Sequence, residues 1–117
     1  MSERDIQRRI LLALAQTFHP RGIFWTADTG TARSMDGARV ISFGLPGQSD
    51  IQGCLDGRWI GIEVKTAKGK QRKSQVAFQR AIEAAGGVYL IARSPEAAVE
   101  GIVSALSPDD DRKAAAR

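Results

Sequence analysis

The sequence predicts a single soluble domain of the α/β class, and three observations favour that class. Two apolar stripes of helical spacing alternate along the chain with runs of β-branched and aromatic residues. One pair of these runs flanks Asp56-Gly57, a dipeptide suited to the positive φ angles of a tight hairpin turn. The chain has 117 residues, which fits one hydrophobic core and not two. We expect residues 1–106 to form this domain and residues 107–117, which lack core-forming periodicity, to be a frayed tail.

The N-terminal segment predicts a helix from about Glu3 to Phe18. Ser2 and Asp5 have the spacing of a capping box, which satisfies backbone donors at a helix start. Pro20 disfavours helical geometry at the residue before it, so the helix should end there. The face expected to enter the core carries residues of helical spacing, namely Ile6, Ile10, Ala13, Leu14 and Thr17.

The next segment predicts four short strands. Ile23 to Thr26 and Val40 to Phe43 are rich in β-branched and aromatic residues, and a polar loop containing glycine is expected between them. Ile51 to Leu55 and Arg58 to Thr66 are expected to pair as a hairpin about Asp56-Gly57.

The C-terminal part predicts a helix, a buried strand and a last helix. Ser74 to Ala85 has an apolar stripe of helical period and is followed by Gly86-Gly87 as a stop signal. Val88 to Ala92 reads as the strand, and Ser94 with Pro95 opens the last helix as N-cap and first helical residue. The expected order is αββββαβα.

The composition excludes several kinds of active site and favours one kind of partner. Lys and Arg number 17 against 13 Asp and Glu, a formal charge of +4, which favours polyanionic partners. The single Cys54 excludes an internal disulfide framework and a multi-cysteine zinc site, and the single His19 excludes paired-histidine acid/base chemistry. No apolar run approaches the roughly 20 residues that span a bilayer, so we expect no membrane and a bacterial or infected-host cytoplasm. Hydrolysis by this chain would have to use carboxylates.

The candidate chemical residues lie in the hairpin. Glu63 and Lys65 should project from the same face of a strand, because strand side chains alternate. Asp50 enters the neighbouring strand and could bring a second carboxylate beside them. Oxygen ligands of this kind suit Mg²⁺, with the remaining positions open to phosphate oxygens. The alternative is a solvated Glu-x-Lys ion pair with no function.

A basic stretch follows that hairpin and contains no Asp or Glu before Glu83. It is expected to neutralise backbone phosphates, and its alternative is an ordinary solvated loop. Trp25 and Trp59 could stack on unpaired bases, although packing in the strand core is the expected role of both. The residues expected to contact DNA are Lys68, Lys70, Arg72, Lys73 and Arg80.

Three parts of the sequence resemble the compact VRR-NUC nucleases of the PD-(D/E)XK superfamily. They are residues 44–53 (GLPGQSDIQG), Glu63-Val64-Lys65-Thr66 with Gly69-Lys70, and Gln75 with Gly86-Gly87. The resemblance runs from about Glu3 to Val99, and Ser49 departs from the proline that commonly precedes the aspartate. It implies a restriction-endonuclease-like αβββαβ core, a central mixed sheet flanked by helices, with one short strand peripheral to it and a C-terminal helix added.

The same resemblance implies roles for single residues. Asp50 and Glu63 would be ligands of Mg²⁺, or of Mn²⁺ in its place, and the Val64 main-chain carbonyl would complete the site. Lys65 would orient or activate the attacking water, and Gln75 matches a glutamine at the start of the following helix. An acidic residue on the first helix would join them: Glu3 fits best, and Asp5 competes with it.

The expected function is therefore a metal-dependent endonuclease acting on branched DNA such as Holliday junctions or flaps. Two symmetric incisions in a four-way junction would need two active sites, so a C2 homodimer is expected. Two alternatives remain open: a non-catalytic branched-DNA-binding or interaction module on a nuclease fold, and an endonuclease that cuts linear duplex DNA.

Overall fold

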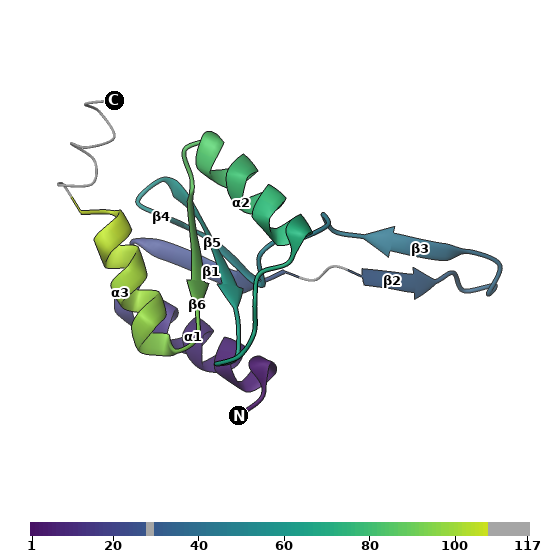
Figure 1. Ribbon diagram of the computed structural model, residues 1–117, viewed down its shortest axis with the longest axis horizontal. Coiled ribbons are helices and arrows are strands. Elements are labelled where there is room, and N and C mark those ends of the chain that lie inside the picture. Colours follow the sequence, from purple (N-terminus) through teal and green to yellow (C-terminus); the bar gives the residue numbers. More distant parts are fainter. Residues whose placement is uncertain (28–29, 108–117) are drawn as a thin grey trace.

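The computed structural model describes residues 1–27 and 30–107. Its main sheet has four strands, with helices on both faces (Figure 1). The strand order is β1-β4-β5-β6. The first three strands are antiparallel and β6 runs parallel to β5, so the sheet is mixed. This confirms the predicted α/β class. The strands of the sheet are β1 (Gly22–Thr26), β4 (Ile51–Leu55), β5 (Arg58–Val64) and β6 (Val88–Ala92).

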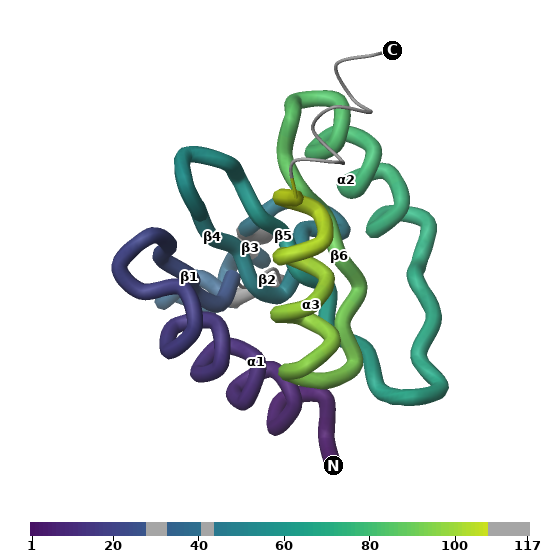
Figure 2. Tube along the Cα trace, turned by 90° about the vertical axis from the view of Figure 1, so that its left-hand side faces the viewer, coloured from purple at the N-terminus to yellow at the C-terminus, as the bar shows by residue number. Residues whose placement is uncertain are grey.

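Three helices cover the sheet. The helices α1 (Glu3–Phe18) and α3 (Pro95–Ala105) pack against each other over one face, whereas α2 (Lys73–Ala84) lies on the opposite side and contacts β6 (Figures 1 and 2). The hydrophobic core fills the space between the first face and the two helices. Its fully buried side chains include Ile10, Leu14, Ile51, Leu55, Ile60, Ile62, Val64, Ala98 and Ile102.

The predicted N-terminal helix is confirmed at both ends, Glu3 and Phe18. The Ser2 hydroxyl accepts a hydrogen bond from the Asp5 backbone N–H at 3.1 Å, and the Asp5 carboxylate accepts from the Ser2 N–H and hydroxyl. These bonds satisfy donors that a helix start otherwise leaves unpaired. They also hold the Asp5 side chain at the helix cap.

The predicted β4–β5 hairpin is also confirmed. Asp56 has φ 51° and Gly57 has φ 83°, the positive angles that a tight two-residue turn requires. The Arg21 guanidinium binds the Asp56 carboxylate from outside the hairpin. The strand β5 ends at Val64, earlier than predicted, although the Lys65 N–H still donates to the Ala92 carbonyl at 3.1 Å.

The expectation of a polar loop between the first two short strands is wrong in part. It contains β2 (Gly30–Arg33), which pairs with β3 (Val40–Phe43) in a separate two-stranded sheet. A local turn joins the two strands. The Ser34 N–H donates to the Arg39 carbonyl, and the Arg39 N–H donates to the Ser34 hydroxyl oxygen. Within the turn, the Asp36 carboxylate accepts from the Ala38 N–H. Figure 1 shows this ribbon projecting from the body of the protein.

The apolar stripe predicted on α2 is only partly buried. Ala81 and Ala85 are exposed, and the one residue of α2 that is fully buried is the polar Gln75. The reason is that α2 lies over the β6 side of the sheet rather than across all four strands. The sheet face over β1 and β4 is therefore not covered by α2.

This arrangement corrects the expectation that both tryptophans pack in the core. Trp25 is 41% exposed, and its ring lies edge-on to that of Trp59 with centroids 5.8 Å apart. Trp59 is half-buried. His19 is the C-cap residue of α1.

Two further expectations concern the chain ends and membranes. The frayed tail predicted over residues 107–117 lies outside the described residues, apart from Ser107. Within the part of the chain that the structure describes, no helix has both the length and the apolar composition needed to cross a membrane.

Candidate active site

The hairpin brings Asp50 and Glu63 together. Ile51 pairs with Ile62 in the β4–β5 register, so the residue before Ile51 faces the residue after Ile62. The Val64 backbone N–H donates to Asp50 Oδ2 at 2.8 Å and fixes that carboxylate at the strand end. The Asp50 carbonyl accepts from the Ala27 N–H at 2.9 Å, so the residue that follows β1 also holds this position. Asp50 is half-buried and is the most accessible of the predicted metal ligands on the hairpin.

Glu63 lies at the centre of the site and is only 2% exposed. Its Oε1 accepts a hydrogen bond from Gln75 Nε2 at 2.7 Å and lies 3.6 Å from the Lys65 Nζ. Its Oε2 is buried without a hydrogen-bond partner in the described structure. Burial, and then the neighbouring Asp50 carboxylate, raise the pKa of Glu63 to about 8, and the Lys65 ammonium opposes this rise.

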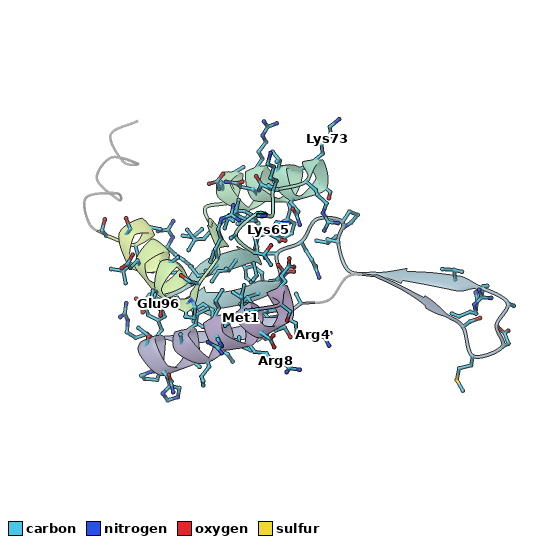
Figure 3. All side chains as sticks on the ribbon, turned by 60° about the horizontal axis from the view of Figure 1, so that its bottom comes forward. Met1, Arg4, Arg8, Lys65, Lys73 and Glu96 are labelled. Atoms are coloured by element: carbon cyan, nitrogen blue, oxygen red, sulfur yellow. The ribbon has the colours of Figure 1, made fainter. Side chains whose placement is uncertain are left out.

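Lys65 is 7% exposed, with Glu63 as its ion-pair partner. Figure 3 shows it between the sheet and α2. The loop after β5 folds over its stem: a Cβ at Gly69 would lie 3.2 Å from the Lys65 Cδ. Arg93 stabilises this loop by donating to the carbonyls of Thr66 and Gly69. The Lys65 ammonium can therefore form a buried ion pair with Glu63 whenever that carboxyl group is ionised, as it would be with a metal ion bound.

The segment before Asp50 packs closely against α2. Gly47 has φ 75°, and a Cβ there would lie 2.1 Å from the Ser74 carbonyl oxygen, so only glycine allows this approach. Ser49 is fully buried and its Oγ lies above Gly61, where an added Cβ would be 2.8 Å away. The β4–β5 register is continuous at Gly61, and the missing side chain there leaves room for Ser49.

The predicted helix-start glutamine is part of this site. Gln75 is 2% exposed and uses both ends of its side chain. Its Oε1 accepts from the Arg72 N–H at 2.8 Å at the start of α2, while its Nε2 donates to Glu63. Gln75 therefore links the position of α2 to the orientation of the Glu63 carboxylate.

The structure does not bring the first-helix acid to this site. Glu3 is exposed, and Asp5 caps α1. Among the described residues no three His, Cys, Asp or Glu side chains are gathered as a metal-binding group. Figure 3 shows Arg4 and Arg8 extending from α1, on the opposite side of the sheet from α2. The carboxylates that meet are thus Asp50 and Glu63.

The predicted DNA-contacting residues are all exposed around this side of the protein. Figure 3 shows Lys73 pointing away from the start of α2, in contrast to the enclosed Lys65. The set comprises Lys68, Lys70, Arg72, Lys73 and Arg80.

Sequence reasoning missed two residues beside the site. Tyr89 is buried next to Gly61 in the β5–β6 register, and burial raises the pKa of its hydroxyl. Gln71 donates to the Tyr89 hydroxyl at 3.4 Å and to Gln79 at 2.8 Å. The alternation of β6 could have placed Tyr89 on the face of Glu63, but only with the β5–β6 register known.

The donor set fits a divalent cation. Two carboxylates lie side by side, one with an oxygen that is buried and unpartnered, and such an orphan atom calls for an ion or water. Hard oxygen ligands are those that Mg²⁺ and Mn²⁺ prefer. Cavities of about 340 and 460 Å³ lie along α1 and the start of α3, and neither is lined by the site residues. The half-buried Asp50 is the part of the carboxylate pair that solvent reaches.

No protein-family model matches the sequence, and a search of curated proteins finds no match.

Proposed function

We propose that this protein is a divalent-metal-dependent DNA endonuclease. The observation that carries the proposal is the meeting of Asp50, Glu63 and Lys65 at one end of the hairpin, with Lys65 Nζ 3.6 Å from Glu63 Oε1. A solvated Glu-x-Lys pair, the alternative from sequence, would not be nearly fully buried or bonded to a glutamine from another element. Buried groups with perturbed protonation beside a specific charge partner are typical of functional sites.

Each residue has a distinct part in this proposal. Asp50 and Glu63 would hold the metal through the carboxylate oxygens that their hydrogen bonds leave available, with the Val64 carbonyl as a third ligand. An ion held there would supply a coordinated water of lowered pKa and would neutralise charge on phosphate oxygens. Lys65 would balance negative charge at the site and orient the attacking water, and Gln75 keeps the Glu63 carboxylate in place.

The order of elements supports the same proposal. The main sheet and its helices follow as α1, β1, β4, β5, α2 and β6, which is the αβββαβ order of the restriction-endonuclease-like core, with the β2–β3 ribbon and α3 added. Fold alone does not define function, and the group formed by Asp50, Glu63 and Lys65 is the main support for a nuclease. From the resemblance to VRR-NUC nucleases we infer that the substrate is branched DNA. Symmetric cleavage of a four-way junction needs two active sites, so we also infer a C2 homodimer.

The test uses labelled four-way junction, flap, single-stranded and linear duplex DNA, each with Mg²⁺, Mn²⁺ or chelator. Wild type should cut in either metal and not in chelator. Asp50→Asn and Lys65→Ala should lose at least about 100-fold in rate, the usual contribution of a positioned catalytic group. Asp56→Asn and Arg39→Ala each remove the charge of an exposed residue outside the proposed catalytic and DNA-contacting sets, and both variants should stay active.

The outcomes separate the alternatives. Junction binding without cleavage by wild type in any metal would identify a non-catalytic binding module. Equal cleavage of linear duplex and branched DNA would identify a duplex endonuclease. Full activity of Asp50→Asn would refute the proposed site.

A further inference from the structure

The two tryptophans of the chain meet on the part of the sheet that α2 leaves open. Trp25 on β1 and Trp59 on β5 form an edge-to-face pair with ring centroids 5.8 Å apart and planes at 71°. Such a contact covers at most one face of each ring. Trp25 is 41% exposed, so part of its indole surface stays in contact with solvent.

This pair shares a sheet face with the candidate active site. Residues 59, 61 and 63 of β5 alternate with the core residues Ile60 and Ile62, so Trp59 and Glu63 point to the same side. Trp25 pairs with Gln52, which pairs with Gly61, so Trp25 points to that side too. No other strand of the main sheet lies between β1 and β4 or between β4 and β5.

The separation suits a single nucleic-acid strand that reaches both places. Trp25 and Glu63 are two strand spacings and two residues apart, which corresponds to about 12 Å between their Cα atoms. A stacked strand advances about 3.4 Å per nucleotide. A strand whose phosphate lies beside the Asp50 and Glu63 carboxylates could therefore place a base at Trp25 about two to four nucleotides away.

The surroundings favour a flat, uncharged ligand group. Ile23 lies two residues before Trp25 on the same face and is 67% exposed, and the intervening β4 presents Gln52 and Cys54 there. None of these side chains is acidic. Aromatic rings at an open face stack with any base whose own face is free, and in a duplex the neighbouring pairs cover those faces.

We propose that the Trp25–Trp59 pair is a stacking site for an unpaired nucleobase of the DNA strand that enters the candidate active site. The inference rests on the proposed function for the kind of ligand, and it adds that the substrate has single-stranded nucleotides beside the scissile phosphate. The two tryptophans then select open or branched DNA over continuous duplex without reading sequence.

The binding test is done in chelator, so that no DNA is cut. Fluorescence anisotropy of labelled oligothymidylate and of blunt duplex gives the two affinities for wild type, Trp25→Ala, Trp25→Phe and Leu12→Ala. Trp25→Ala should bind oligothymidylate about 5-fold to 150-fold more weakly, the range that stacking of one base corresponds to. Trp25→Phe should keep most of the affinity. Leu12→Ala, which truncates an exposed apolar residue of α1 on the other face of the sheet, should match wild type.

A second readout uses the indole itself. In Trp59→Phe the only remaining tryptophan is Trp25, so its emission reports contact directly. Oligothymidylate should quench it and duplex should not. The inference falls if saturating oligothymidylate leaves this emission unchanged, or if Trp25→Ala weakens both DNA forms equally. It also falls if Trp25→Ala converts a dimer to a monomer in sedimentation, since a second copy would then cover this face.

The cleavage assay separates this inference from the proposed function. Quenching and selective loss in Trp25→Ala without any metal-dependent cleavage by wild type would uphold the stacking site and refute the nuclease. Metal-dependent cleavage by wild type, together with unchanged oligothymidylate binding in Trp25→Ala, would uphold the nuclease and refute the stacking site.

Discussion

Replacing Glu63 by glutamine should remove a pH dependence that the metal-free protein carries in its stability. Glu63 is buried, one of its oxygens has no hydrogen-bond partner among the described residues, and Asp50 lies beside it. Burial and that neighbour raise the pKa of Glu63 from 4.5 to about 8 on folding. The glutamine side chain has nearly the same shape as the glutamate it replaces and carries no titrating proton.

The magnitude follows from proton linkage. Between the unfolded pKa of 4.5 and the folded pKa of about 8, the folded protein holds one proton more at Glu63 than the unfolded chain. Stability from this group is thus complete below pH 4.5 and falls as the pH rises through the folded value. One proton corresponds to a slope of about 1.4 kcal/mol per pH unit, or about 3 kcal/mol between pH 5 and pH 7.

The assay is urea denaturation in chelator across this pH range, with the free energy of unfolding of Glu63→Gln subtracted from that of wild type. The difference should fall with pH along the predicted slope. Glu83→Gln, which changes an exposed glutamate of α2, should give a flat difference. Parallel profiles for wild type and Glu63→Gln would refute the reasoning, because they would mean that Glu63 is already ionised at pH 5. Saturating Mg²⁺ should reduce the slope if the ion binds the charged carboxylate.

The remaining predictions concern packing, capping and charge. In Gly57→Ala the added Cβ meets open space, so the positive φ alone should lower the free energy of unfolding by about 1–2 kcal/mol. In Gly47→Ala the added Cβ would also lie 2.1 Å from a backbone atom, so the loss measured in urea melts should be clearly larger. Equal losses in the two variants would contradict this close approach. Gln75→Ala removes a bond to Glu63 and one at the start of α2, so it should lose about 2–4 kcal/mol in the same assay, and a loss below about 0.5 would be evidence against both bonds. Lys73→Ala should weaken DNA binding evenly across sequences and reduce the slope of log K against log salt by about one, and an unchanged slope would exclude a phosphate contact there.

Local signals in the sequence predicted much of the fold. The capping box at Ser2 and Asp5 set the start of α1, and Asp56-Gly57 set the turn between β4 and β5. Alternation in β5 placed Glu63 and Lys65 on one face, and the hairpin turn brought Asp50 to them. Each of these features depends on residues a few positions apart, so periodicity and turn chemistry were sufficient.

Other features depended on which distant elements meet. The β2 strand was not predicted, because Gly30–Arg33 has little strand propensity and forms through its pairing with β3. The expectation that Trp25 packs in the core was wrong because α2 covers the β6 side alone, which no local pattern reveals.

The sequence by itself determined the α/β class, the N-terminal helix, the Asp56-Gly57 turn, and the pairing of Glu63 with Lys65 at the end of β5. Caps, turns and alternation act between near neighbours, so short segments are enough to define them. Only the tertiary structure decided that Gln75 reaches Glu63, that Glu3 stays apart, and that Trp25 faces solvent. These three outcomes depend on how the helices pack on the sheet. That packing is determined by many weak contacts between residues far apart in the sequence, and no short segment specifies it.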